Sequence, residues 1–317
     1  METTSPATVT DTPGPLAPLG GARPPAPAWF HEAIARAPQA MLVRSHQTDV
    51  EVLIWGERGN PGVLLVHGAG AHAHWWAWTA PLLAESYRVA AMSLPGSGGS
   101  QWRDRYSSAD FDDDAAACAR AAGLWEAGMP VYIGHSMGGA HLFHAAVHHP
   151  QRMRGLVLVD TSFRGPAMGP PEPTRDHPRR GRAHDSEAAA VSRFRLMPPQ
   201  PVREPALVDY VARMGLRQSS APDGRPRWIW RRDPDMLPKL RRGLEQGPYP
   251  AAPLAVEIPI LHVVGDRSHV VLRPAPSPLS TDVPRIVIPD CHHHIMLDQP
   301  LALVAVLRAL LAVWPRA

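Results

Sequence analysis

The chain has 317 residues, which is enough for one large α/β domain with an inserted subdomain. Its formal net charge is only +3 and is not gathered into one basic helix, so we expect no nucleic-acid partner. Two distant cysteines, Cys118 and Cys291, and the lack of any window of about twenty apolar residues favour a cytoplasmic protein without disulfides or a membrane span.

The N-terminal residues 1–28 are rich in Pro, Ala, Gly and Thr, and they predict a disordered tail that lacks the features of a signal peptide. After a short helix at 31–37, apolar strands alternate with helices. We expect strands at 50–55, 63–66, 89–92, 131–133 and 155–159, and helices at 76–85, 110–124 and from the end of the fourth strand to about 149. This alternation predicts a mostly parallel sheet with helices on both faces.

The alternation stops after Asp160. Residues 161–253 are rich in Pro and Arg and predict a cap inserted after the strand at 155–159. Strands resume at 260–264 and 285–288, and a final helix follows, with Asp298 expected as its cap. The predicted core therefore comprises residues 29–160 and 254–317.

One short motif indicates a reaction class. The strand-like run 131–133 leads into Gly134-His135-Ser136-Met137-Gly138, which is the layout of a nucleophile elbow. The small glycines allow the tight turn that leaves Ser136 projecting at the top of the sheet. An activated hydroxyl at this place predicts attack on an acyl carbon.

An oxyanion hole and a base are needed beside such a serine. His67-Gly68-Ala69-Gly70 follows the first buried strand, so the amides of Ala69 and Met137 could hold a developing oxyanion, although an ordinary turn would look alike. The base should be a histidine after the last strand. The run 292–294 supplies three competing histidines there.

Taken together, these motifs resemble the α/β-hydrolase superfamily over about residues 40–315. The likeness rests on His67-Gly68, the turn at 95–100, the elbow at 134–139, and the run from His293 to Pro300. It implies an α/β-hydrolase fold. By the family pattern His293 is the base, and the flanking histidines are structural or line the pocket.

The acid departs from the commoner family pattern. Many members carry Asp where this chain has Ser268, which cannot bear a charge. Asp266 lies two residues earlier, and Asp160 ends the strand at 155–159, which is the sixth strand of the family fold and from which some branches take their acid. A carboxylate must orient the imidazole and stabilise the imidazolium. We predict Asp160, with Asp266 as the alternative.

Other histidines and aromatic residues admit two interpretations each. His141, His144 and His148 share one helical face, but no carboxylate or cysteine joins them in the sequence, so we predict no metal site and no cofactor. His135, Trp75 and Trp76 are predicted to line the substrate pocket. For the two tryptophans, core packing is an equal alternative.

We therefore predict a serine hydrolase that cleaves a carboxylic ester or related acyl bond of a small molecule through an acyl-enzyme. A lactonase, a thioesterase or a carbon–carbon bond hydrolase would use the same machinery, because the fold does not choose among them. A non-catalytic member that binds a small ligand is the rival of a different kind, motivated by Ser268. The sequence gives no oligomeric state.

Overall fold

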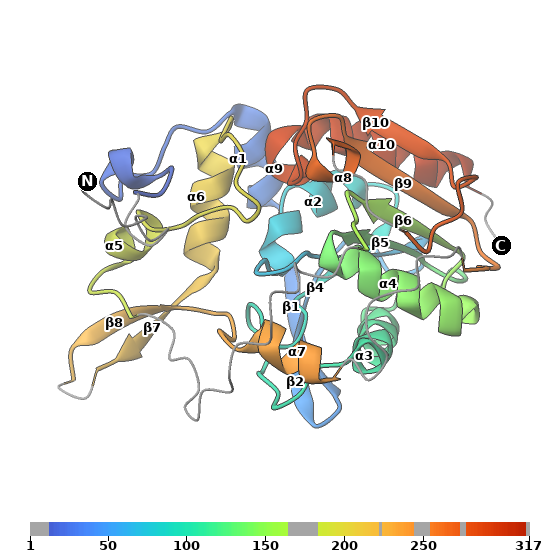
Figure 1. Cartoon of the computed structure of the whole chain (residues 1–317), viewed down its shortest axis with the longest axis horizontal. Helices are drawn as coiled ribbons and strands as arrows, with labels where there is room; N and C mark the ends of the chain where they lie inside the picture. Colours follow the sequence, from blue (N-terminus) through green and yellow to red (C-terminus); the bar gives the residue numbers. More distant parts are fainter. Residues whose placement is uncertain (1–12, 164–182, 222–223, 244–253, 273–276, 315–317) are drawn as a thin grey trace, which may run out of the picture.

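A computed structural model describes residues 13–163, 183–221, 224–243, 254–272 and 277–314. Its main feature is an eight-stranded sheet of order β1-β2-β4-β3-β5-β6-β9-β10 (Figure 1). The strands are β1 Gln39–Ser45, β2 Thr48–Trp55, β3 Gly62–Val66, β4 Arg88–Met92, β5 Val131–His135, β6 Gly155–Val159, β9 Ile260–Gly265 and β10 Arg285–Ile288. From β4 to β10 the neighbours are parallel, whereas β1–β2 and β2–β4 are antiparallel. The predicted mostly parallel sheet is confirmed.

The edge strand β1 was not among the predicted strands. It pairs with β2 alone, and its side chains are largely exposed, including Leu42 at 61%. An edge strand of this kind needs neither a continuous apolar run nor a clean alternation, so its sequence gives little signal.

Helices cover both faces of the sheet, as predicted. On one face lie α1 Ala28–Ala35, α2 Thr79–Leu83 and α10 Pro300–Val313, and on the other lie α3 Ser108–Ala121 and α4 Met137–His148 (Figure 1). Alternate β3 side chains enter the two cores: Val63 and Leu65 join one, and Leu64 and Val66 join the other. Because β3 is buried on both faces, its sequence is a continuous apolar run.

Short elements connect this framework. They are the 3-10 helices η1 Ala17–Leu19, η2 Ala73–Trp76 and η3 Pro150–Arg152, and the helices α8 His269–Leu272 and α9 Ile295–Asp298. Among the described residues, no helix has the length and apolar character needed to cross a membrane.

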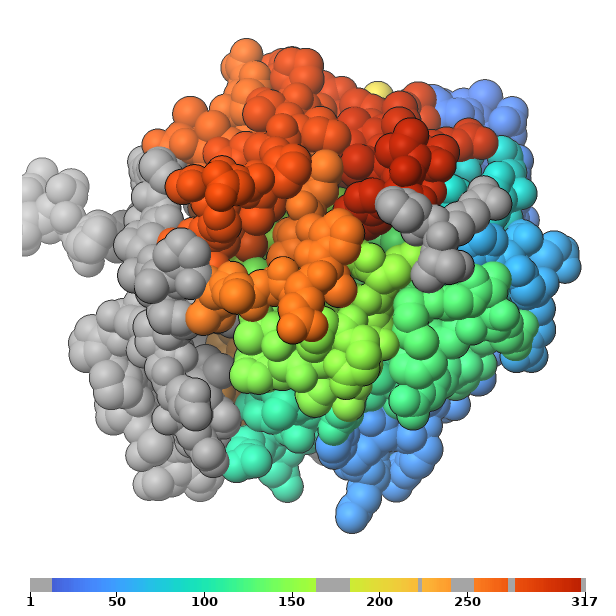
Figure 2. All heavy atoms as spheres, turned by 90° about the vertical axis from the view of Figure 1, so that its right-hand side faces the viewer, coloured from blue at the N-terminus to red at the C-terminus, as the bar shows by residue number. Residues whose placement is uncertain are grey.

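The described part of the segment between β6 and β9, which the sequence predicted as a cap and which we call the cap below, lies mostly at one end of the molecule, but its last helix lies beside the core (Figure 1). It contains α5 Glu187–Val191, α6 Pro205–Met214, the hairpin of β7 Leu216–Ser220 and β8 Pro226–Trp230, and α7 Met236–Gly243. Figure 2 views the opposite end, where core segments dominate the surface. Polar bonds join the cap to the core, because the Tyr106 hydroxyl donates to Asp233 at 2.8 Å and Nζ of Lys239 donates to the carbonyl of Arg103 at 2.9 Å.

The N-terminal segment differs from the predicted disordered tail. Residues 13–28 are ordered against the cap, with Leu16 only 1% exposed. The amide of Gly14 donates to the carbonyl of Ser192, and Arg213 donates to the carbonyl of Gly21 at 2.8 Å. Residues 13–28 are therefore not the disordered tail that composition predicted, because they pack against the cap, a contact that composition cannot show; residues 1–12 lie outside the described part of the chain.

The start of the last helix also differs from the prediction, in which Asp298 was its cap. Gln299, not Asp298, is the N-cap residue of α10. The Asp298 carboxylate instead accepts from the amide of His292 at 2.7 Å and pairs with Arg203 of the cap at 2.8 Å. This aspartate therefore holds the loop before α9 against the cap.

Candidate active site

Ser136 lies on a sharp turn between β5 and α4. Its backbone has φ 52° and ψ −120°, a left-handed conformation that costs a non-glycine residue of order 1–3 kcal/mol. Glycines make the turn possible. A Cβ on Gly134 would lie 2.6 Å from the Cα of Gly139, and one on Gly138 would press into the carbonyl oxygen of His67. The strained turn holds the serine hydroxyl at the carboxyl edge of the sheet.

His293 reaches Ser136 from the loop between β10 and α9. Its Nε2 lies 3.1 Å from the Ser136 Oγ, and its Nδ1 lies 2.6 Å from Oδ2 of Asp160. The imidazole is buried, with a side-chain exposure of 6%. Three residues from three separate segments thus form a continuous hydrogen-bonded row.

Asp160 follows β6 directly and is fully buried. Its Oδ1 accepts from the amide of Gly265 at 3.1 Å, and its Oδ2 accepts from the hydroxyl of Ser268. Ser268 therefore donates to the carboxylate from the position where many family members carry the acid. Asp266 lies elsewhere, because its Oδ1 accepts from the amide of Cys291 at 3.0 Å.

Burial dominates the electrostatics of this pair. It raises the pKa of Asp160 to about 6, although the hydrogen bonds from Ser268 and Gly265 act in the opposite direction. Burial, with a smaller effect of nearby His269, lowers the pKa of His293 to about 3. At neutral pH the imidazole is therefore neutral beside a carboxylate. In that state Nδ1–H donates to Asp160, and Nε2 can accept the serine proton.

The loop after β3 lies directly against the serine. A Cβ on Gly68 would be 3.0 Å from the Cβ of Ser136, so only glycine permits this approach. His67 fixes the loop, since its Nδ1 bonds the Gly68 carbonyl at 2.7 Å and its Nε2 accepts from the Leu94 amide at 2.9 Å. Ala69 follows on this loop and is exposed to solvent.

The amide of Met137 belongs to the first turn of α4. The first backbone bond of this helix runs from the Ala140 amide to the Ser136 carbonyl at 3.1 Å, so the amide of Met137 lies before the helical bonds begin. Such free amides, at the positive end of a helix, suit a developing negative charge.

The predicted pocket residues separate into two groups. Trp75 contacts His294 with ring centroids 5.3 Å apart, and His135 contacts His293 at 4.8 Å, so both lie beside the loop that carries His293 and His294. Trp76 is fully buried in the core, which favours the packing alternative for this residue.

The two histidines that flank His293 have structural contacts. His292 bonds Asp298 through its Nδ1 at 2.8 Å, and the amide of His294 donates to Oε1 of Gln200 at 2.8 Å. Gln200 belongs to the cap and was not predicted as a site residue. No motif marks it, because its role depends on where the cap packs.

The three histidines of α4 face different partners. His144 Nδ1 lies 2.6 Å from a carboxylate oxygen of Asp112, while the Nδ1 of buried His141 lies 3.3 Å from the Ser108 hydroxyl. The ring of His148 lies against that of His144, tilted by 47° with the centroids 4.2 Å apart. The carboxylate that the sequence did not reveal thus comes from α3, but the three imidazoles do not converge on one point.

These features define a class of protein, and comparison with known proteins agrees. The profile of the α/β hydrolase fold family matches residues 61–300, more than half of the chain, so the chain belongs to that family.

Among curated relatives, a pimeloyl-[acyl-carrier protein] methyl ester esterase of Edwardsiella ictaluri is 35% identical over 104 residues, which are 33% of this chain and 38% of that protein. Lipase LipV of Mycobacterium tuberculosis is 37% identical over 112 residues, 35% of this chain and 41% of the lipase. The match thus spans well under half the length of each relative.

Solved structures share the fold over most of the chain. A thioesterase domain from the curacin biosynthetic pathway has a TM-score of 0.65 at 21% identity, covering 86% of this chain and 99% of the domain. The hydrolase of E-2-(acetamidomethylene)succinate has a TM-score of 0.68 at 19% identity, covering 87% of this chain and all of that one. At these identities the likeness concerns the fold alone.

Proposed function

We propose that the protein is a serine hydrolase that cleaves a carboxylic ester of a small molecule through Ser136, His293 and Asp160. The observation that carries this proposal is the row of hydrogen bonds, 3.1 Å from Ser136 Oγ to His293 Nε2 and 2.6 Å from His293 Nδ1 to Asp160. Such a row can activate an otherwise weak hydroxyl nucleophile.

The chemistry proceeds in two halves. His293 Nε2 takes the proton of Ser136 as the oxygen attacks the ester carbonyl, and the amides of Ala69 and Met137 receive the oxyanion. The imidazolium then returns that proton to the departing alcohol, which leaves an acyl group on the serine. Water, deprotonated by the same imidazole, attacks the acyl carbon, and as the acyl–oxygen bond breaks the imidazolium returns its proton to Ser136, so that the carboxylic acid leaves and the free enzyme is restored.

An ester is preferred over other acyl bonds because the matched relatives are named as a methyl ester esterase and a lipase. A lactonase, a thioesterase or a carbon–carbon bond hydrolase would use the same residues. The non-catalytic alternative was motivated by Ser268, which lacks a charge. The hydrogen bond from Ser268 to Asp160 weakens that motive, since it supports a carboxylate supplied from β6.

A series of p-nitrophenyl esters of increasing acyl length, with lactone and thioester substrates alongside, tests the proposal. Ser136→Ala should lose at least about 10³-fold of the turnover. Ser280→Ala, a serine in the loop before β10, serves as the matched control and should keep full activity. Full activity in Ser136→Ala would refute the proposal, and a better lactone or thioester substrate would redirect it.

A further inference from the structure

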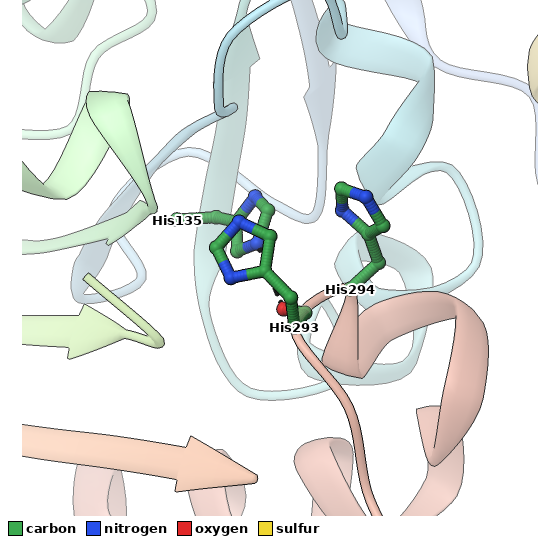
Figure 3. Close-up of side chains that lie close together, drawn as sticks. All are labelled: His135, His293 and His294. Atoms are coloured by element: carbon green, nitrogen blue, oxygen red, sulfur yellow. Dashed lines mark hydrogen bonds between the residues drawn. The ribbon is translucent and has the colours of Figure 1, made fainter. Parts of the chain in front are cut away.

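Three imidazoles meet beside Ser136. His135 comes from the end of β5, and His293 and His294 come from the loop before α9 (Figure 3). One ring nitrogen from each lies within 4.8 Å of the other two, and all three residues are buried. No local sequence pattern indicates this group, because two of these residues lie more than 150 positions from the third and only the fold brings them together.

The hydrogen bonds of two of these rings, His135 and His293, resemble those of metal ligands. His135 Nε2 lies 3.1 Å from the backbone carbonyl of His293, so it carries the proton and leaves Nδ1 with a lone pair. That buried Nδ1 has no hydrogen-bond partner among the described residues. His293 donates from Nδ1 to Asp160 and leaves its Nε2 lone pair. Histidine ligands in proteins are typically held by such a bond to a carbonyl or a carboxylate.

We propose that His135, His293 and His294 form a reversible inhibitory site for a borderline divalent transition-metal ion such as Zn²⁺ or Co²⁺. Imidazole nitrogens bind these ions at about 2.0–2.1 Å, so the rings must close in by roughly an ångström or more from their present spacing. Coordination to His293 Nε2 occupies the lone pair that would accept the Ser136 proton. The fourth ligand position is left to water or to the serine oxygen.

A second group competes for the same base. Asp160, His269 and His293 also bring potential ligand atoms within 4.8 Å of one another, but His269 is exposed and Asp160 already accepts three hydrogen bonds. Binding there through Nδ1 of His293 would break the bond to Asp160. The first group keeps that bond, and we therefore favour it.

The test measures metal binding directly on the full chain at pH 7, by calorimetric titration with Zn²⁺ and by the visible absorption of Co²⁺. We expect an intense tetrahedral Co²⁺ band, and at least ~10-fold weaker binding in His294→Phe, which retains a ring against Trp75. His269→Gln and His148→Gln are the matched controls and should bind as the wild type does. Unchanged affinity in His294→Phe, or a loss that follows His269 or His148, would overturn the site.

Further measurements distinguish a folding defect, or a failure of the proposed function, from a failure of the metal site. Circular dichroism and melting show whether His294→Phe is folded, and His294→Gln replaces it if it is not. Inhibition of turnover by Zn²⁺ rests on the proposed esterase function, whereas the Co²⁺ spectrum requires no activity. A wild-type protein that shows the tetrahedral Co²⁺ band but has no esterase activity would contradict the proposed function alone. A wild-type protein that is active but lacks the Co²⁺ band would contradict the metal site alone.

Discussion

Replacement of Asp160 by asparagine tests how the carboxylate sets the tautomer of His293. The Gly265 amide can only donate, so the side-chain oxygen of the substituted asparagine must stay at the place of Oδ1, which accepts that bond at 3.1 Å. The amide nitrogen then faces the Nδ1 of His293 and donates to it. This forces the ring proton onto Nε2, which can no longer accept the proton of Ser136. We expect kcat to fall by about 10³–10⁴-fold with little change in KM.

The same substitution should not destabilise the fold at neutral pH. Folding raises the pKa of Asp160 from 3.8 to about 6. At about 1.4 kcal/mol per pKa unit, keeping this side chain ionised in the folded protein costs about 3 kcal/mol. Because the folded pKa is raised, this cost is absent below pH 3.8 and complete above about pH 6. Asparagine avoids it but loses charge-assisted hydrogen bonds. We expect the free energy of unfolding of Asp160→Asn to equal or exceed that of the wild type at pH 7, and to lose this advantage at pH 3.5.

Steady-state kinetics and urea unfolding measure both effects, with Asp266→Asn as the matched control. Asp266 bonds the amide of Cys291 and not the base, so its substitution should leave kcat within a few-fold of the wild type. Full turnover in Asp160→Asn, or a large loss in Asp266→Asn, would refute the assignment of the acid.

Three further predictions concern the pH profile and the packing. In a pH–rate profile, turnover should fall as the pH drops through about 6, where the buried pair of Asp160 and His293 takes up a proton. Ser268→Ala should shift this fall to higher pH, because the Ser268 hydroxyl lowers the pKa of the Asp160 carboxylate. An unshifted profile would contradict this. Gly138→Ala should cost about 1–3 kcal/mol in urea unfolding, since its methyl group meets backbone, and a neutral result would show that the elbow can relax. Asp114→Ala should lower the free energy of unfolding by about 3–5 kcal/mol, because it removes the carboxylate that pairs with the buried Arg103 guanidinium at 2.8 Å. A loss below about 1 kcal/mol would contradict this.

The parts of the site that local sequence determines were predictable. Ser136 lies in a turn whose glycines are required by contacts within a few residues or with the neighbouring strand, so the motif alone reveals it. The buried strands were equally visible because both faces are apolar. Asp160 could be preferred but not established, since its partner His293 lies 133 positions away.

What could not be predicted depends on packing between distant segments. Gln200 and Arg203 bind the catalytic loop from the cap, and no motif marks either residue. The composition of the segment around Leu16 indicates disorder, yet Leu16 is buried and the segment bonds the cap through Gly14 and Ser192. The convergence of His135 on the loop of His293 is likewise a property of the fold and not of any local pattern.

The nucleophilic role of Ser136 is the central claim, and active-site labelling tests it most directly. The protein is incubated with a fluorophosphonate at about pH 7.5, where the base is neutral, and intact mass and peptide mapping then locate the adduct. We predict one adduct per chain, on Ser136, that is lost in Ser136→Ala and slowed by orders of magnitude in His293→Gln. Labelling that persists in Ser136→Ala at the wild-type rate, or no labelling of a folded wild-type protein, would contradict the account.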